Sequence, residues 1–486
     1  MIRTVHKFFR SNKGHYLMLA LLLGILFFIS IYRLPHSPAT WFDEGINIGI
    51  AKSFANEGVY SLQVAPGEFV KEKSFLITTN YPVLIPVALS IKLFGSNFIA
   101  ARLPMVVYLF LFCIATYLFV RRVYNKNTAL LTLALIISFV PFYGNGKAVL
   151  GEVPGLFYFL LGLLFLHGTQ RNIKLFFIGL SLGLSIATKP FFIILLPALA
   201  IGELYKYRKN WKFLLKRAII IASGITIPLM IWLYTIIPEF SLSRIIKTVS
   251  YYSNSYADSD FVKLIFSNIF RFVSETTPLH FLLLLVVSIV ALLLKIRKRR
   301  SINEVEIIIF VFVILNLLWY LKTPGWYRYF YPAHLLLFLS FPAALLQIIP
   351  KRLAIIFIVC LILFQSAFLF YKKDDLLYYS TETVKTSEYI QEHLPVGGNI
   401  LVINGPSLAF LIKNREVYQY LQINPTLHFG VDMFEDLKEE SFDNIIINGS
   451  LFGLANKEDV EKYLTESYIP VNQIGHYDIY QDNTAL

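Results

Sequence analysis

The chain of 486 residues is 56% hydrophobic and 15% charged, with a formal net charge of +13. Its mean hydropathy of +0.61 excludes a water-soluble globular protein, because such proteins carry about 25% charged residues. The lysines and arginines interrupt apolar runs instead of forming one continuous basic face, so the charge indicates membrane topology and not a nucleic-acid partner. The composition predicts a polytopic α-helical membrane protein.

The first apolar segment, residues 16–33, follows a short basic N-terminal stretch. It is too long for a signal peptide and lacks a clear small-residue cleavage site, so we expect an uncleaved span with a cytoplasmic N-terminus. Two adjacent carboxylates, Asp43 and Glu44, come shortly after it. Acidic residues that border a bilayer are either solvated or held for a function.

About eleven segments have the length and apolar character of membrane spans. They cover residues 16–33, 103–120, 128–145, 153–168, 175–188, 191–205, 218–236, 279–295, 306–321, 330–348 and 353–371. With this count, every basic cluster between spans lies on the side of the N-terminus, as the positive-inside rule requires. These clusters are at residues 121–126, 171–174, 206–217, 295–300 and 351–352.

Residues 81–94 are apolar but short, and they contain two prolines and Lys92. Counting them as a span would place all five basic clusters outside, so we predict an interfacial or re-entrant helix within a first outer loop, residues 34–102. A second long outer loop, residues 237–278, is rich in tyrosine and has the composition of a lid or binding loop.

From about residue 373 the sequence becomes polar. Residues 383–393 have helical spacing, and two β-branched runs follow at residues 399–403 and 444–447. We therefore predict a transmembrane domain over residues 1–372 and a small extracytoplasmic α/β domain over residues 373–486.

Single ionisable residues lie close to the predicted outer membrane boundary, each within apolar or aromatic sequence. They are Asp43, Glu44, Arg102, Lys147, Glu152, Lys189, Lys322 and Arg328. Solvated charges would occur on both faces, so this distribution indicates one site that faces the outer leaflet. The two cysteines, Cys113 and Cys360, lie in apolar runs and support neither a disulfide nor a cysteine metal site.

The sequence Asp43-Glu44-Gly45 resembles the Asp-Glu loop of C-type (GT-C) polyprenyl-phosphate-sugar glycosyltransferases, especially the protein O-mannosyltransferase and aminoarabinose lipid A transferase branch. The resemblance continues in order over roughly residues 15–350. Its further motifs are Asn80-Tyr81-Pro82, Ala101-Arg102-Leu103-Pro104, Gly151-Glu152-Val153-Pro154, Thr188-Lys189-Pro190 and Arg328-Tyr329-Phe330-Tyr331. The chain lacks the Glu-Lys-Pro of the aminoarabinose enzymes and the paired prolines of the mannosyltransferases after Tyr81, which leaves the acceptor open.

The resemblance implies an inverting enzyme that moves a hexosyl or pentosyl group from a polyprenyl-phosphate donor to a hydroxyl of a protein, lipid or glycan outside the plasma membrane. This chemistry needs a base for the acceptor proton and cations for the departing phosphate, but no nucleotide site. The expected catalytic residues are Asp43 as the base, with Glu44 and Glu152. The expected phosphate partners are Arg102, Lys189 and Arg328, and the expected substrate contacts are Tyr81 and Tyr331. A divalent metal ion at Asp43 or Glu44 stays open.

Structural explanations compete with several of these roles. Asp43 could cap a helix and Glu44 could favour its first turn, while Arg102 and Arg328 could anchor helix ends at the lipid headgroups. Two other functions also remain. A flippase or transporter of lipid-linked glycans would need the cations but no base at Asp43, and in an assembly scaffold the outer charges should be replaceable.

Overall fold

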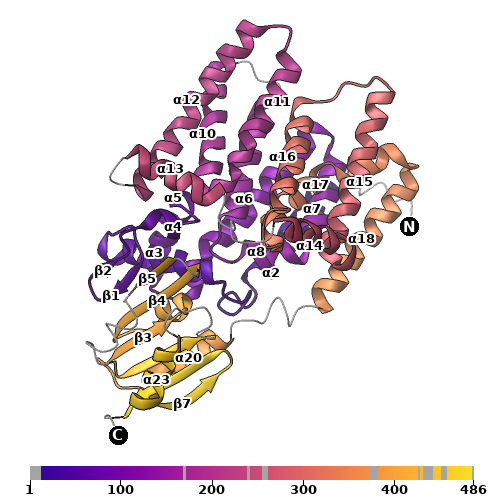
Figure 1. The fold of residues 1–486 in the computed structure, drawn as a ribbon. Helices are drawn as coiled ribbons and strands as arrows, with labels where there is room; N and C mark the ends of the chain where they lie inside the picture. Colours follow the sequence, from indigo (N-terminus) through magenta and orange to yellow (C-terminus); the bar gives the residue numbers. More distant parts are fainter. Residues whose placement is uncertain are drawn as a thin grey trace.

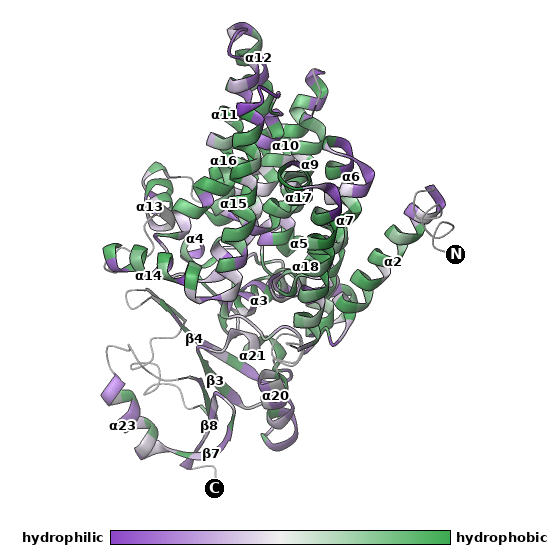
Figure 2. Cartoon of the chain, turned by 90° about the vertical axis from the view of Figure 1, so that its right-hand side faces the viewer, coloured by the Kyte–Doolittle hydropathy of each residue, from purple (hydrophilic) through white to green (hydrophobic). Residues whose placement is uncertain are grey.

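The computed structural model describes residues 12–167, 171–237, 241–253, 261–371, 381–424, 427–430, 442–449 and 457–483. In this part of the chain, a bundle of long helices lies above a C-terminal mixed sheet, with the first loop between them (Figure 1). The helices of the bundle consist mainly of hydrophobic residues, whereas the C-terminal sheet region mixes hydrophilic and hydrophobic residues (Figure 2). The predicted membrane bundle with a small C-terminal α/β unit is confirmed at this level.

Each predicted span coincides with a helix or a pair of helices. They are α2 (Asn12–Ile31), α6 (Phe98–Val123), α7 (Lys126–Ile137) with α8 (Val140–Gly146), α9 (Glu152–Leu166), α10 (Asn172–Thr188), η1 (Pro190–Ile194) with α11 (Leu195–Tyr207), α12 (Trp211–Ile236), α15 (Thr276–Arg297), α16 (Glu304–Tyr320), α17 (Tyr331–Ile348) and α18 (Lys351–Tyr371). Seven are long and apolar enough to cross a membrane, or eight if α7 and α8, bent by 67°, form one span. Helices α9, α10 and α16 have 15, 17 and 17 residues, which is shorter than the roughly 20 residues that a full crossing needs.

Asparagine caps set where several of these helices begin. Asn97 accepts a hydrogen bond from the Ala100 amide at the start of α6, and Asn125 accepts from Asn127 and Thr128 at the start of α7. At α16, Asn303 forms a capping box with Glu306. Such caps satisfy backbone amides that have no partner inside the helix.

The basic clusters gather at one end of the bundle, which we call the basic end. Arg122, at the end of α6, donates to the carbonyls of Leu164 and His167 beside the end of α9. Lys295 of α15 pairs with Glu306 of α16 at 2.7 Å, and Lys206 of α11 pairs with Glu304. These contacts bring three of the five predicted basic clusters, those at residues 121–126, 206–217 and 295–300, to helix ends of the bundle.

The first loop holds α3 (Phe42–Glu57), β1 (Gln63–Ala65), β2 (Glu68–Phe69), α4 (Lys73–Leu76) and α5 (Tyr81–Phe94). Helix α5 packs against α3 and α6 with one apolar face, while Ile85, Leu89 and Leu93 on the other face are 45%, 58% and 66% exposed. The expected short helix is present, and its exposed apolar face is typical of a helix that lies at a membrane interface.

The second long loop is more ordered than its composition indicated. It contains two helices, α13 (Leu242–Ser253) and α14 (Phe261–Ser274). Leu242, Ile246 and Val249 recur at helical spacing and are all exposed, so this segment is an amphipathic helix instead of an irregular lid. Residues 254–260 of this loop, which include Tyr256, Asp258 and Asp260, lie outside the described ranges.

The C-terminal unit contains α20 (Thr381–His393), β3 (Asn399–Ile403), α21 (Pro406–Leu411), β4 (Glu416–Asn424), β5 (Leu427–Gly430), β6 (Asn444–Asn448), α23 (Lys457–Ser467), β7 (Tyr468–Ile474) and β8 (Tyr477–Asp482). The strand order is β5-β4-β3-β6-β8-β7. Strand β3 runs parallel to β4 and β6, and the outer pairs are antiparallel. The predicted helix and the two predicted strands, β3 and β6, are confirmed. The two strands lie at the centre of the sheet, and their continuous β-branched runs are typical of strands that are buried on both faces.

The C-terminal unit packs directly behind the carboxylate pair. A methyl group on Gly45 would lie 2.5 Å from the Ser407 amide nitrogen of α21. Gln419 of β4 donates to the Gln63 carbonyl of β1 at 2.7 Å, and Lys52 of α3 donates to the Phe410 carbonyl at 3.2 Å. The sheet is thereby joined to α3, the helix that carries Asp43 and Glu44.

Candidate active site

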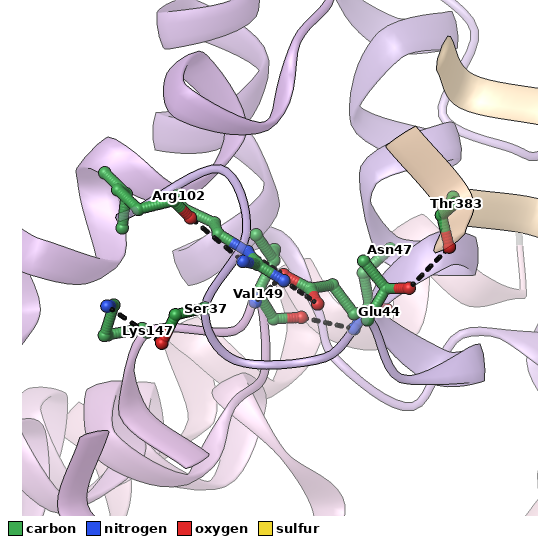
Figure 3. Close-up of polar contacts among 9 residues, drawn as sticks. Ser37, Glu44, Asn47, Arg102, Lys147, Val149 and Thr383 are labelled. Carbon is green, nitrogen blue, oxygen red and sulfur yellow. Dashed lines mark hydrogen bonds and ion pairs between the residues drawn. The ribbon is translucent and has the colours of Figure 1, made fainter. Parts of the chain in front are cut away.

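Glu44 and Arg102 form a sealed ion pair between α3 and α6. The two oxygens of Glu44 accept from Nε and Nη2 of Arg102, each at 2.8 Å, and both side chains are 0% exposed (Figure 3). Glu44 also accepts from the Val149 amide at 3.1 Å, and Arg102 donates through Nη1 to the Leu34 carbonyl at 3.0 Å. These contacts fix the start of α3 against two neighbouring segments.

The segment that follows α8 is held against the same helix. Asn47 donates to the Val149 carbonyl at 2.8 Å, and Lys147 donates to the Tyr32 carbonyl at 3.0 Å and lies 3.4 Å from the Ser37 hydroxyl (Figure 3). Burial and the nearby Arg102 lower the pKa of Lys147 to about 7. Neither Asn47 nor Lys147 was predicted as a site residue. Lys147 was identified only as an ionisable residue near the outer membrane boundary, and the signal for Asn47 is its position one helical turn after Asp43.

Asp43 pairs with Arg328, which comes from the connection between α16 and α17. Asp43 Oδ2 lies 2.7 Å from Arg328 Nη1, and the two side chains are 25% and 7% exposed. The guanidinium lies 5.6 Å from the Trp41 ring centroid, 5.1 Å from Trp326 and 5.4 Å from Tyr329. Burial would lower the pKa of Arg328, but Asp43, Tyr329 and Glu152 raise it above its ordinary value, so the group stays cationic.

The Arg328 connection is anchored on both sides of that residue. The Tyr327 hydroxyl lies 3.0 Å from His334 Nδ1, and His334 Nε2 lies 3.0 Å from His280 Nδ1. Asn316 donates to the Tyr329 carbonyl at 3.0 Å. These bonds hold the short helix η2 (Tyr327–Tyr329) in place, and with it the guanidinium.

Glu152 and Lys189 form a third ion pair, between the start of α9 and the end of α10. Both are buried, and the second carboxylate oxygen of Glu152 has no hydrogen-bond partner among the described residues. Glu152 is one of the charges that raise the pKa of Arg328. The structure thus joins six of the predicted residues in three ion pairs, Glu44 with Arg102, Asp43 with Arg328, and Glu152 with Lys189.

The two predicted substrate tyrosines differ in accessibility. Tyr81 is partly exposed, and its hydroxyl donates to the Pro228 carbonyl at 3.4 Å. Tyr331 is 0% exposed, and its hydroxyl reaches the Phe142 carbonyl at 3.5 Å. Tyr251 of α13, which the sequence did not single out as a site residue, packs edge-on against Phe75 with 4.8 Å between ring centroids, and burial, with Tyr329 and Asp43, raises its pKa.

The carboxylate pair does not fit a divalent cation in this arrangement. Both oxygens of Glu44 are bonded to Arg102, and Asp43 is paired with Arg328. Calcium and magnesium sites need several oxygen ligands that are not already neutralised by a cation. Among the described residues, no group of three or more histidine, cysteine, aspartate or glutamate side chains could hold a metal ion.

Comparison with known proteins gives the same assignment as the sequence motifs. Residues 83–234 match the family described as dolichyl-phosphate-mannose-protein mannosyltransferase, whereas no curated protein matches the chain by sequence search. The fold is similar to that of ArnT from Cupriavidus metallidurans bound to undecaprenyl phosphate, with 12% identity, a TM-score of 0.61 and coverage of 97% of this chain and 98% of that one.

The fold is also similar to that of the archaeal oligosaccharyltransferase AglB from Archaeoglobus fulgidus, in complex with an inhibitory peptide and a dolichol-phosphate. The identity is 11%, the TM-score is 0.56, and the match covers 98% of this chain and 75% of AglB. At such identities the likeness establishes the fold. Together with the family match, it confirms the predicted resemblance to C-type glycosyltransferases.

Proposed function

We propose that this chain transfers a sugar from a polyprenyl-phosphate donor to an acceptor hydroxyl by a single inverting displacement, because residues 83–234 match the dolichyl-phosphate-mannose-protein mannosyltransferase family. The family and the fold make it a membrane glycosyltransferase of the lipid-phosphate-sugar class. The catalytic roles, the acceptor and the sidedness belong to our proposal.

The observation that carries the mechanism is the difference in exposure between the two adjacent carboxylates. Asp43 is 25% exposed, whereas Glu44 is 0% exposed and fully engaged by Arg102. A general base must reach the proton that it removes. Asp43 is therefore the base, and Glu44 with Arg102 positions the start of α3 so that Asp43 faces the acceptor.

Arg328 and Lys189 are the proposed partners of the donor phosphate. Both are cations at the Asp43 end of the bundle, and Arg328 Nε is a buried donor without a partner among the described residues. A phosphate that binds Arg328 competes with Asp43 for the same guanidinium, so donor binding would release the carboxylate for proton abstraction. Arg102, predicted as a third phosphate partner, is sealed by Glu44, and we assign it a positioning role.

The remaining predicted residues support this centre. Glu152 holds Lys189, and Tyr81 is accessible for a substrate contact, whereas the buried Tyr331 packs beneath the Arg328 connection. We place the basic end in the cytoplasm under the positive-inside rule. With eleven spans, the centre and the C-terminal unit then lie outside the cytoplasmic membrane, where a lipid, a protein or a glycan is the acceptor.

The test is reconstitution of the full chain in proteoliposomes with synthetic polyprenyl-phosphate sugars and a mixture of peptide, lipid and glycan acceptors. The proposal predicts release of free polyprenyl phosphate in step with the appearance of a glycosylated product. If the protein instead moved intact donor across the bilayer without loss of its sugar, the flippase alternative would be correct.

A further inference from the structure

Helix α14, in the second long loop, binds the backbone that leads to Arg328. Its residue Asn268 is 1% exposed. The Asn268 amide nitrogen donates to the Thr323 carbonyl at 2.8 Å and to the Leu321 carbonyl at 3.2 Å, and the Tyr320 carbonyl lies 3.4 Å from it. These carbonyls belong to the end of α16 and to the turn that follows. One side chain of α14 therefore holds the start of the Arg328 connection, residues 321–330.

A second residue of α14 binds the same turn. Arg271, three residues after Asn268, donates through Nη1 to the Gly325 carbonyl. Gly325 has a φ of +82°, and a methyl group there would overlap the Asn268 amide oxygen and lie 2.8 Å from the guanidinium carbon of Arg271. Glycine allows both this backbone conformation and this close approach. The turn is therefore shaped to fit two side chains of α14.

Helix α14 also contacts the connection beyond Arg328. The Phe272 ring is 8% exposed, and its centroid lies 5.8 Å from that of Tyr320 and 5.8 Å from that of Phe330. On the opposite face of the helix, Phe266 is 68% exposed. One face of α14 thus meets the connection on both sides of Arg328 in the sequence.

A purely structural role would explain some of these contacts. The last carbonyls of a helix have no amide partner within it, so Asn268 could serve only to complete the end of α16. The connection does more than end a helix, however, because it places the Arg328 guanidinium 2.7 Å from Asp43. A guanidinium binds phosphate through N–H groups in a rigid planar array, so a small displacement of its backbone weakens that contact.

We propose that Asn268 is a positioning residue for the donor phosphate. Through Asn268 and Arg271, helix α14 holds the turn at residues 321–325, so that the Arg328 guanidinium is in place for the phosphate of a polyprenyl phosphate. This inference rests on the proposed phosphate role of Arg328. It adds a residue of the second long loop, which lies outside the family match at residues 83–234.

The experiment measures equilibrium binding of a fluorescent polyprenyl phosphate to the full-length protein in nanodiscs. It compares the wild type with Asn268→Ala, Asn268→Ser and Arg328→Gln, and with each Asn268 variant combined with Arg328→Gln. Gln365→Ala is the matched control, since Gln365 of α18 is also a buried amide, 6% exposed, and it accepts from the Ser138 hydroxyl at 2.7 Å. Competition by uncharged polyprenol measures binding of the lipid chain alone, and the melting temperature reports folding.

We expect Asn268→Ala to raise the Kd for polyprenyl phosphate about tenfold, the equivalent of roughly one hydrogen bond. Asn268→Ser, which keeps one donor, should raise it less. Binding of polyprenol should stay within about twofold of wild type, because a neutral lipid has no phosphate for Arg328 to bind. In the Arg328→Gln background, Asn268→Ala should change the Kd less than about twofold, since a residue that acts through Arg328 then has nothing to position. Gln365→Ala should bind both lipids as the wild type does.

An unchanged Kd for polyprenyl phosphate in Asn268→Ala, with or without a lower melting temperature, would overturn the inference and leave Asn268 a structural residue. An equal loss in the Arg328→Gln background, or an equal loss of polyprenol binding, would overturn it as well. If Asn268→Ala does not fold, the same criteria apply to Asn268→Ser. A wild type that binds polyprenyl phosphate but transfers no sugar would overturn the proposed function alone, whereas a wild type that does not bind this lipid would overturn both.

Discussion

Each cation of the candidate site is matched by one acid from a different segment: Arg102 by Glu44, Arg328 by Asp43 and Lys189 by Glu152. The pairs differ in burial, and burial decides what each can do. A fully buried ion pair holds its two helices in fixed positions, because separating the partners would leave an unpaired charge away from water. A pair that stays partly open can exchange its partner for a substrate.

Replacement of Glu44 by Gln should therefore destabilise the protein more than replacement of Asp43 by Asn. Glu44→Gln leaves the guanidinium of Arg102 buried without a counter-charge, a loss of about 3–5 kcal/mol, and should lower the apparent unfolding temperature in detergent by several degrees. Asp43→Asn, at a partly exposed position, should change it little. Equal melting temperatures for the two variants would contradict the positioning role of Glu44.

Lys147 should make stability depend on pH. Burial and Arg102 lower its folded-state pKa to about 7 from 10.5, so between these values the unfolded chain binds more protons than the folded one. Stability from this group should rise as pH increases from 7 towards 10.5, and it should become independent of pH below 7, where both states carry the proton. In Lys147→Met, melting temperatures between pH 7 and 9 should rise less than in the wild type. Parallel pH profiles for the two proteins would refute this prediction.

At the residue level, the sequence predicted which ionisable groups belong to the site but not how they pair. Asp43, Glu152 and Lys189 could be identified from the sequence, because an ionisable residue at the end of a membrane span is costly and usually has a function. Whether Arg102 meets a phosphate or Glu44 depends on a contact across 58 residues, which no local pattern encodes.

At the level of elements, α3 links the reaction centre to the C-terminal sheet. Its first turn carries Asp43 and Glu44, and its fourth residue, Gly45, lies against Ser407 of α21. The absence of a side chain at Gly45 allows this close approach. Under our proposal, a shift of the C-terminal unit would therefore displace Asp43 through α3.

Gly45→Ala should reduce turnover strongly, because the added methyl would lie 2.5 Å from a backbone nitrogen and 2.8 Å from Pro406 Cγ, so that α3 or α21 must shift. A displacement of about 1 Å at a reacting group can cost roughly 100-fold in rate. Gly24→Ala is the control, since nothing lies within 4 Å of a methyl at that helical glycine. The account of α3 fails if both variants keep wild-type kcat.

Helices and strands with a continuous apolar or β-branched sequence could be predicted. Elements of mixed composition, whose structure depends on contacts with other parts of the chain, could not. The apolar helices and the β-branched strands β3 and β6 were identified within a few residues of their bounds. Strands β7 and β8 were missed, because each has one partly exposed face and mixed composition. Helix α13 was missed because aromatic and polar residues between its apolar positions gave the segment the composition of a loop.

For the whole molecule, the proposed eleven-span topology places the basic end and the C-terminal unit on opposite sides of the membrane. In a background without Cys113 and Cys360, a cysteine at Lys209, between α11 and α12, should react only with reagent supplied from the cytoplasm. A cysteine at Val396, which is 76% exposed, should react with an impermeant maleimide added outside. Labelling of both positions from the same side would contradict the eleven-span topology.

The central claim is that Asp43 is the base for sugar transfer, and turnover of Asp43→Asn with a polyprenyl-phosphate sugar donor tests it most directly. A positioned base contributes about 10²–10⁴ to the rate, so kcat should fall at least 100-fold. Inhibition by polyprenyl phosphate should stay within a few-fold of wild type, and Asp478→Asn in β8 should be fully active. Release of lipid phosphate by Asp43→Asn at more than a third of the wild-type rate would contradict the account.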